Sequence, residues 1–458
     1  MLFHTWPFFV FFVIFYAVFL ALRKTRFWLP WLLIASYVFY GWWNPYYLFL
    51  ILYATTVDFF VVRAMDGSRH RRRWLAVSVM NNLGLMGFFK YGAFFTGNMN
   101  QLLAALGLAY QLPVPNLPLP VGISFFTFQS MSYTIDFYRG NVARQPSFVR
   151  FASFVALFPQ LVAGPIERAR QLLPQLNQFP KIQGRDVADG LSLFVVGLFK
   201  KAAMADYLSL YVTPIYATPD RYDAAALALA TFAFAWQIYF DFSGYTDMAR
   251  GIGRMMGIRF MQNFNNPYLA TSLGNFWARW HISLSTWFRD YVYIPLGGNR
   301  RGAWRTYRNL FVTMVVSGLW HGAAWKFVIW GAIHAIATML TRKAERSDWY
   351  RQRVPRFPKQ VLVFLIVCLA WIFFRAENTS DAWLILSRIT SATWHDPAFP
   401  VLALGLVSVI WIYQFAYESR LRRVLATSPV RIALVVAMIV YLMVAPGRHT
   451  EAFIYFQF

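Results

Sequence analysis

The stretch FWARWHISLSTWFRDYVYIPLGG, residues 276–298, places His281 among aromatic side chains and ends in a pair of glycines. A second histidine, His321, lies in SGLWHGAAW, residues 317–325. A titratable imidazole is costly at membrane depth, because the surroundings offer no water to its charged form. In a chain as apolar as this one, the two histidines therefore indicate a functional site.

The composition is that of a membrane protein. Of the 458 residues 58% are hydrophobic, 20% aromatic and 14% charged, with a mean hydropathy of +0.43. An ordinary soluble domain is excluded. The segment 6–22 is long, aromatic and followed by its basic cluster, so we interpret it as a retained first helix and not as a cleavable signal peptide. Cys368 lies in an apolar run as the only cysteine, which predicts a packing role, and no Cys or His cluster has the spacing of a metal site.

The net charge of +24 is explained by membrane orientation and not by nucleic-acid binding. Its basic residues fall in short loops between apolar segments, as the positive-inside rule predicts for cytoplasmic loops, and not along one exposed face. The uncharged stretch 91–135 and the acidic-leaning stretch 377–397 would then face outward. This pattern places both termini on the outer side of the membrane.

The apolar segments predict an all-α polytopic membrane protein of about a dozen membrane segments, forming a single domain over 1–458. From 243 to 305 polar residues and glycines interrupt every apolar run, which predicts short helices dipping into the membrane from the cytoplasmic side. The stretch 151–164 is interpreted as a re-entrant element. The remaining expected segments are 6–22, 29–62 with a turn at Asn44-Pro45, 74–90, 120–138, 188–212, 224–242, 308–321, 324–340, 360–375, 400–417 and 431–446.

Together with the two histidine stretches, three further stretches resemble a known family. They are LPVGISFFTFQSMSYTIDFYRG (119–140), LFPQLVAGPIER (157–168) and YFDFSGYTDMARGIGRMMGIRF (239–260). The chain resembles the membrane-bound O-acyltransferase family over nearly its whole length, and within it the bacterial branch that acetylates polysaccharides. The resemblance implies helices, some of them re-entrant, around a central funnel.

Acyl transfer from a thioester to a hydroxyl needs a base for the hydroxyl proton and a polar wall for the developing oxyanion. His321 matches the histidine that the family is thought to use in catalysis, and Gly318 and Gly322 beside it permit close approach. His281 matches the second family histidine. It can orient the acceptor, polarise the thioester carbonyl or hold the re-entrant helix in place. His334 is expected in a helix interior, in a packing or hydrogen-bonding role.

Charged residues inside apolar sequence are expected to form ion pairs. Asp241 and Asp247 flank FSGY, which we interpret as a turn, and their expected partners are Arg250 or Arg254. A buried ion pair that fixes the turn is the favoured interpretation, with a place in the funnel as the alternative. Asp290 with Arg289 and Arg279 presents the same choice.

The expected acyl donor is acetyl-CoA, a cytosolic thioester whose phosphates would meet the basic inner face. It is a substrate, and no permanently bound cofactor is expected. Candidate contacts are Arg279, Arg289, Arg300 and Arg301, although the positive-inside rule explains these arginines equally well. No Gly-rich phosphate loop followed by Lys-Ser or Lys-Thr is present, so nucleotide hydrolysis has no support.

The resemblance implies a multi-pass protein of the bacterial inner membrane that passes acetyl groups outward to a polysaccharide. An alginate-type exopolysaccharide is the favoured acceptor, with cellulose and peptidoglycan as alternatives, and an extracytoplasmic SGNH-type acetyltransferase is the implied partner. In the final hexapeptide FIYFQF, Tyr455 is either part of an aromatic membrane anchor or a temporary acyl acceptor. The rival interpretations are a transporter with a midplane site and a channel subunit that performs no chemistry.

Overall fold

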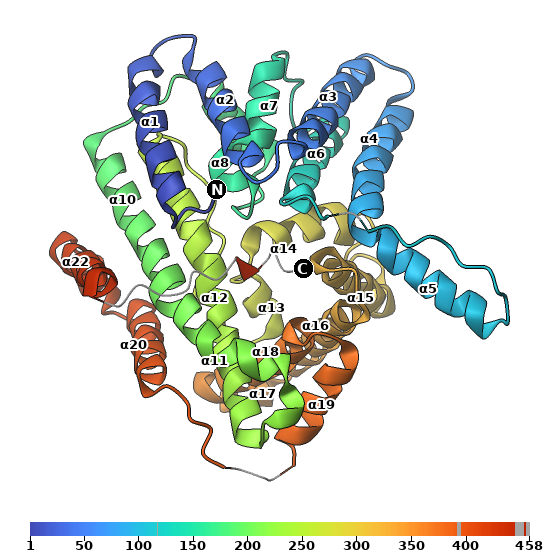
Figure 1. Ribbon diagram of the computed structural model, residues 1–458, viewed down its shortest axis with the longest axis vertical. Coiled ribbons are helices and arrows are strands. Elements are labelled where there is room, and N and C mark those ends of the chain that lie inside the picture. The colour runs from blue at the N-terminus through green and yellow to red at the C-terminus, as the bar shows by residue number, and fades with distance from the viewer. Residues whose placement is uncertain (117, 392–394, 445–452, 455–458) are drawn as a thin grey trace. The chain divides into compact units, whose positions relative to one another are not determined.

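The computed structural model describes residues 1–116, 118–391, 395–444 and 453–454, and every regular element in these ranges is a helix (Figure 1). This confirms the all-α prediction. Three of the described helices are long and apolar enough to cross a membrane: α3 (Tyr47–Met65), α12 (Ala224–Met255) and α18 (Arg356–Arg375). The shorter apolar helices are α1 (Trp6–Leu22), α2 (Trp28–Gly41), α20 (Val401–Tyr417) and α22 (Ser428–Val444). The count of about a dozen membrane segments is therefore not confirmed.

The chain divides into two compact units. One contains residues 1–191 and 249–261, and the other contains residues 192–248 and 262–458. The long helix α12 contributes to both, since its first part belongs to the second unit and its last turns to the first. The single domain over 1–458 stays a prediction.

The first unit is built around aromatic side chains. Phe158 lies among Phe11, Phe15 and Phe39, with ring centroids 5.1 to 5.4 Å away. Its backbone N–H donates to Ser36 Oγ at 3.2 Å, which satisfies a buried donor. The other helices of this unit are α4 (Arg71–Met86), the π-helical η1 (Gly87–Tyr91), α5 (Gly92–Ala105), α6 (Ile123–Tyr138), α7 (Phe148–Ala156), α8 (Phe158–Leu161), α9 (Ala169–Leu176) and the start of α10 (Gly184–Phe199).

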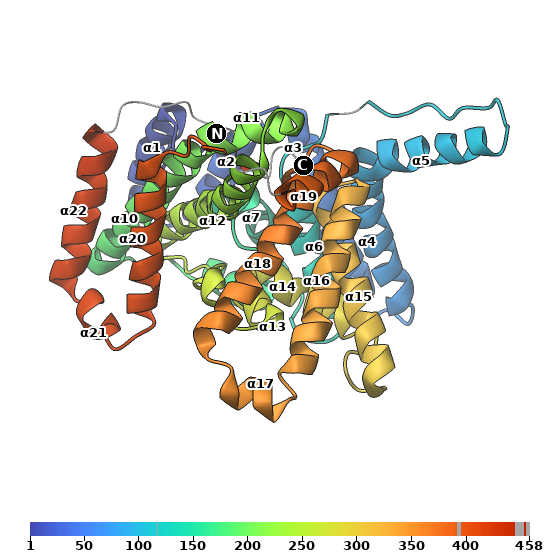
Figure 2. The ribbon, with the colours of Figure 1, turned by 90° about the horizontal axis from the view of Figure 1, so that it is seen from below.

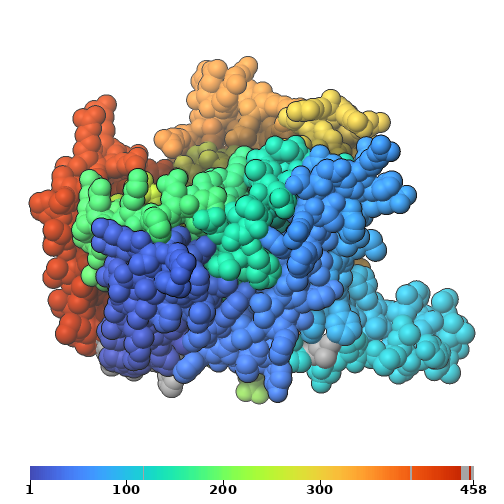
Figure 3. All heavy atoms as spheres, turned by 90° about the horizontal axis from the view of Figure 1, so that it is seen from above, coloured from blue at the N-terminus to red at the C-terminus, as the bar shows by residue number. Residues whose placement is uncertain are grey.

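Two predicted segments of this unit have a different extent in the structure. The segment 74–90 continues as helix, because α4 is followed directly by η1 and α5, and α5 projects away from its neighbours (Figures 2 and 3). The segment 151–164 forms two short helices, α7 and α8, whose residues from Phe151 onward are all buried. Such burial in protein is what a re-entrant element requires, and its depth in a membrane stays a prediction.

Asp58 is a buried carboxylate in the middle of α3. It accepts hydrogen bonds from Ser78 Oγ at 2.6 Å, from Asn82 Nδ2 at 2.9 Å and from Ser130 Oγ at 2.5 Å. The donors come from α4 and α6, so this one side chain joins three helices of the first unit. All three donors are neutral, and they replace the water that burial removes.

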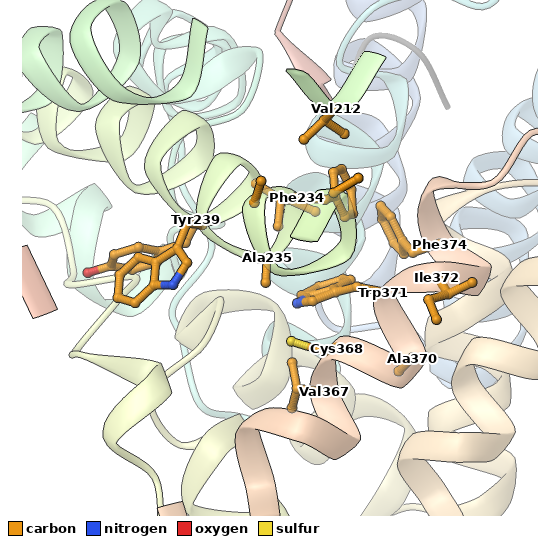
Figure 4. Close-up of a cluster of buried hydrophobic side chains, with 14 of the residues drawn as sticks. Val212, Phe234, Ala235, Tyr239, Val367, Cys368, Ala370, Trp371, Ile372 and Phe374 are labelled. Carbon is orange, nitrogen blue, oxygen red and sulfur yellow. The ribbon is translucent and has the colours of Figure 1, made fainter. Parts of the chain in front are cut away.

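The second unit encloses a large apolar core. Figure 4 shows Cys368 in it, near Trp371 and Ala235, which confirms the packing role expected for this residue. The helices of this unit not yet named are η2 (Lys200–Ala205), α11 (Asp206–Ala217), η3 (Pro219–Arg221), η4 (Pro267–Leu269), α13 (Leu273–Trp277), α14 (Ile282–Phe288), η5 (Arg289–Tyr293), α15 (Gly302–His321), α16 (Trp325–Ala344), α17 (Asp348–Arg353), α19 (Thr379–Ile389) and α21 (Arg422–Leu425).

The predicted end of a segment at 242 and the predicted turn at FSGY are both wrong, because α12 continues through these residues to Met255. Gly244 serves close helix packing here. A Cβ on Gly244 would lie 2.7 Å from the carbonyl oxygen of Gly197, and a Cβ on Gly197 would lie 2.5 Å from that of Gly244. Glycine lets the backbones of α10 and α12 touch, as small residues do between membrane helices.

Candidate active site

His321 is the last residue of α15 and lies at the turn to α16. The two helices run side by side in both ribbon views (Figures 1 and 2). They approach closely because of two glycines. A Cβ on Gly318 would lie 2.1 Å from the carbonyl oxygen of Phe327, and one on Gly331 would lie 2.5 Å from that of Met314. The expected segments 308–321 and 324–340 are helical and form a hairpin with His321 at its turn, and backbone contact between the two helices positions this residue.

The His321 ring is enclosed by aromatic side chains. Its centroid lies 5.0 Å from those of Trp320 and Trp330 and 5.3 Å from that of Phe374. The residue is 5% exposed. Its position at the C-terminal end of a helix stabilises the cation that an imidazole becomes on taking a proton, because the last carbonyl groups carry partial negative charge. These surroundings suit a general base that is shielded from bulk water.

His281 is held by Asn263. It precedes α14 with the left-handed backbone angles φ 41° and ψ 54°, which are unusual for a residue with a side chain. Asn263 Oδ1 lies 3.2 Å from His281 Nδ1, and it also accepts hydrogen bonds from Ser283 N at 3.1 Å and Ser283 Oγ at 2.9 Å. A backbone N–H can only donate, so the Asn263 atom is the oxygen, and a proton on His281 Nδ1 would be donated to it. Ser283 Oγ also lies 3.4 Å from this nitrogen.

Burial favours the neutral form of the His281 ring. The residue is fully buried and lies outside the three candidate membrane spans, and desolvation lowers the pKa of its imidazole to about 3. The ring lies 4.6 Å from that of Phe242 and 6.2 Å from that of Trp320, which also contacts His321. The structure thus places one tryptophan in ring contact with both histidines.

His334 packs among aromatic rings, as expected for a helix interior. Its centroid lies 4.7 Å from that of Trp330 and 5.0 Å from that of Trp277, and its ring is stacked on Phe276 at 6.0 Å. The residue is fully buried in α16. Neither ring nitrogen has a hydrogen-bond partner among the described protein atoms, so packing, and not the alternative interhelical hydrogen bond, describes its contacts.

A cavity of about 160 Å³ lies between α15 and the segment from α13 to η5. Its wall includes Ser317, one helical turn before His321, and Trp277, whose ring is 5.7 Å from that of Trp330. The cavity is mainly apolar and has one cation, Arg289, in its lining. The lining residues are Trp277, Leu284, Ser285, Phe288, Arg289, Tyr293, Leu310, Thr313, Met314 and Ser317.

The four arginines proposed for coenzyme A differ in their surroundings. Arg279 forms an ion pair with Glu418 and donates to the carbonyl oxygen of Asn265 at 3.2 Å. Its expected pairing with Asp290 is therefore wrong, whereas Arg289 does pair with Asp290, with Nε 2.8 Å from Oδ1. Arg300 and Arg301 are exposed before α15. Of the four, only Arg289 lines the cavity.

The partner expected for Asp241 is also wrong. Asp241 Oδ1 lies 2.8 Å from Lys201 Nζ, and the same ammonium group lies 2.8 Å from Asp206 Oδ1. Asp247 pairs with Lys200 at 2.7 Å. In the first unit, Arg254 pairs with Asp189 at 2.6 Å and lies 3.7 Å from Asp186. The sequence offered a signal for Lys201, because two lysines inside the apolar segment 188–212 require partners. Asn263 had no such signal.

Phe453 and Ile454 are buried in the second unit. Phe453 is 1% exposed, and its ring lies 5.0 Å from that of Tyr245 and 5.8 Å from that of Phe242. The backbone N–H of Ile454 donates to Asp241 Oδ2 at 2.7 Å. Tyr455 lies outside the described residues. Phe453 and Ile454, which precede it, contact Asp241 and Phe242 of α12, and Phe242 is the ring neighbour of His281.

Comparison with known proteins identifies the family. The sequence profile described as MBOAT, membrane-bound O-acyltransferase family, matches residues 124–377, more than half of the chain. The chain belongs to this family. It is thus an acyltransferase and a membrane protein, and the two rival interpretations without chemistry are set aside. The family match includes His281, His321 and the four arginines, and ends before Tyr455.

Three curated relatives are similar over most of the chain. A probable alginate O-acetylase of Pseudomonas aeruginosa is 43% identical over 370 residues, which are 79% of this chain and 70% of the relative. That of Azotobacter vinelandii is 43% identical over 79% of this chain and 72% of its own length. A peptidoglycan O-acetyltransferase of Helicobacter pylori is 36% identical over 78% of this chain and 72% of its own length.

Proposed function

We propose that this acyltransferase takes acetyl groups from acetyl-CoA on the cytoplasmic side of a bacterial inner membrane and passes them outward for O-acetylation of a polysaccharide. The observation that carries the proposal is His321 at the hairpin turn, enclosed by aromatic rings and one helical turn from an apolar cavity. The alginate O-acetylases at 43% identity favour an alginate-type polymer. Peptidoglycan is the second candidate, supported by the relative at 36% identity.

The chemistry assigned to His321 is general base catalysis. Its ring nitrogen takes the proton of the acceptor hydroxyl, the hydroxyl oxygen forms a bond to the acetyl carbon, and the bond between that carbon and the thioester sulfur breaks. The sulfur leaves with the electron pair of that bond, and the imidazolium supplies the proton that completes the thiol of coenzyme A. Exclusion of water by Trp320, Trp330 and Phe374 protects the thioester from hydrolysis.

Of the roles open to His281, orientation of the acceptor fits its hydrogen bonds best. With the proton on Nδ1 and directed at Asn263, the neutral ring has only a lone pair on Nε2. A lone pair can accept a hydrogen bond from a hydroxyl group but cannot polarise a carbonyl oxygen by donation. We therefore assign His281 to holding the acceptor hydroxyl.

The donor site is assigned to the cavity beside α15. An apolar space with one arginine suits a thioester arm whose phosphates remain near the cytoplasmic surface, and Arg289 is the favoured phosphate contact among the four candidates. Arg300 and Arg301 are exposed at the start of α15 and can contribute at longer range. Arg279 is the weakest candidate, because it is paired with Glu418 and does not line the cavity.

On the outer side, Tyr455 is proposed as the temporary acetyl acceptor. The docked Phe453 and Ile454 support this, because these two buried residues immediately precede Tyr455 in the chain. A phenyl ester is activated enough to pass its acetyl group to the serine of an SGNH-type partner. Coenzyme A would then remain on the cytoplasmic side.

The test of the catalytic assignment is His321→Ala, with His70→Ala as a matched control at an exposed histidine. Polysaccharide acetyl content is measured in a complemented deletion strain, and coenzyme A release is measured with purified protein and acetyl-CoA. We expect His321→Ala to abolish both at unchanged protein level. Near-normal acetylation would refute the assignment.

The relay is tested separately with Tyr455→Phe, which removes the phenol oxygen and retains the ring. Loss of acetylation at unchanged protein level supports the relay, since an anchor needs only the ring. Full acetylation by the Phe variant would leave the hexapeptide as an anchor only.

A further inference from the structure

Lys201 lies between two buried carboxylates. One ammonium group, Lys201 Nζ, lies between the carboxylates of Asp206 and Asp241, at 2.8 Å from each. All three residues are buried, at 3 to 4% exposure for the lysine and Asp206 and 2% for Asp241. A buried carboxylate is costly unless cations and hydrogen-bond donors surround it.

The C-terminal segment supplies such a donor. Asp241 uses Oδ1 for Lys201 and Oδ2 for the backbone N–H of Ile454, at 2.7 Å. A hydrogen bond from an amide to a carboxylate is stronger than one between neutral groups, and more so in a buried setting. The contact uses the backbone, so it fixes the position of the chain and is independent of the side chain at residue 454.

Aromatic contacts define the same position from a second direction. The Phe453 ring lies against Tyr245, which is one helical turn beyond Asp241 on α12, and against Phe242, which directly follows Asp241. Charge and ring contacts therefore converge on two successive residues of the C-terminal segment. Phe242 also lies 4.6 Å from the His281 ring, so this position borders the candidate active site.

We propose that Asp241, held by Lys201 and Asp206, is a positioning residue that docks the C-terminal segment of this chain beside the active site. The docking site recognises a backbone N–H that follows a buried aromatic side chain. Its catalytic consequence rests on the proposed function, because correct placement of residues 453–454 sets the reach of the Tyr455 hydroxyl. The docking itself does not depend on that function.

Amide hydrogen exchange of the full-length protein tests the docking directly. Mass spectrometry of C-terminal fragments that include or lack the Ile454 amide gives its exchange rate. In Asp241→Asn we expect this amide to exchange roughly 10- to 100-fold faster than in the parent, as follows from weakening a buried hydrogen bond to a charged group. The matched control is Asp247→Asn, which changes the other lysine-paired carboxylate of α12 and should leave the rate unchanged.

A second variant covers the case in which Asp241→Asn disturbs folding, which would be visible as fast exchange throughout α12. Phe453→Ala leaves the charged cluster intact and removes the ring contacts, and it should also accelerate the Ile454 amide. An Ile454 amide that exchanges as in a free peptide in the parent, or that keeps the parent rate in both variants, would overturn the proposal.

Polysaccharide acetylation separates this proposal from the relay. If both are right, Asp241→Asn and Tyr455→Phe each lose acetylation, but only Asp241→Asn releases the segment. If Tyr455→Phe is fully active while Asp241→Asn accelerates exchange, the docking stands and the relay fails. Slow exchange in Asp241→Asn together with loss of acetylation would refute the docking, because Asp241 would then act in another way.

Discussion

Replacing Gly318 by alanine should disable the enzyme without touching a catalytic group. The added Cβ would lie 2.1 Å from the Phe327 carbonyl oxygen, about 1.3 Å inside the 3.4 Å at which ordinary van der Waals contact begins. The obstacle is backbone of α16, so a side-chain rotation cannot relieve it. One helix of the hairpin has to move by about 1 Å, and His321 and Trp330 lie on opposite helices of that hairpin.

The expected cost follows from that displacement. Overpacking of this kind destabilises a protein by ~1–3 kcal/mol, which lowers the thermal midpoint but leaves a folded population. A misplacement of ~1 Å at a catalytic group costs ~100-fold in rate. We therefore expect Gly318→Ala to retain substantial folded protein and to lose most of its turnover.

The assay is coenzyme A release by purified protein, with protein amount and thermal midpoint measured in parallel. Gly405→Ala on α20 is the matched control, because a Cβ there meets nothing within 4 Å. Turnover of Gly318→Ala within a factor of about three of the parent would refute the argument that backbone contact in this hairpin positions His321. Equal loss in both variants would point to a general effect of the substitution.

Three further outcomes are expected. Asp58→Ala removes the common acceptor of three buried hydrogen bonds, although Asn82 Nδ2 keeps its bond to the Ser78 carbonyl oxygen, and it should lower the free energy of unfolding by ~2–4 kcal/mol. The measurement is the thermal midpoint in detergent, and an unchanged midpoint contradicts the role of this carboxylate in joining three helices. Desolvation raises the pKa of Glu167, in the loop before α9, to about 7, so the folded protein keeps this proton at a pH where the unfolded chain has lost it. The free energy of unfolding should therefore fall by up to roughly 3 kcal/mol as pH rises from 4.5 to 7, and Glu167→Gln should remove this pH dependence. The same pH dependence in the parent and the variant would contradict the prediction. Reporter fusions should be cytoplasmic at Ser68 and Gln352 and external at Pro115, and reversal at two of the three sites overturns the orientation.

Most helices could be predicted from the sequence, because a membrane-compatible helix needs only a long apolar run and flanking polar residues. The hairpin α15 to α16 and the helices α1, α2, α18, α20 and α22 lie where hydropathy places them. The main error in the predicted helices concerned a glycine, Gly244. In FSGY the same residue type can mark a turn or a close helix contact, and the choice depends on Gly197, which is far away in sequence.

The candidate catalytic histidines were predictable for a similar reason. His321 and His281 are costly in an apolar chain, and their local sequences resemble those of a family, so both signals lie within a few residues. The partners of charged residues were not predictable. Asp241 was expected to pair with Arg250 or Arg254, which follow it on its own segment, but it pairs with Lys201, 40 residues earlier in the chain.

The sequence by itself thus determined the class of protein, the helical segments and the two histidines, because hydropathy and local motifs are properties of neighbouring residues. Only the tertiary structure decided which acceptor faces His281 Nδ1, which arginine lines the cavity and where residues 453–454 dock. These features depend on single hydrogen bonds and ring contacts between distant segments. Such contacts are selected by the packing of the whole unit, and many different pairings are compatible with the same local pattern.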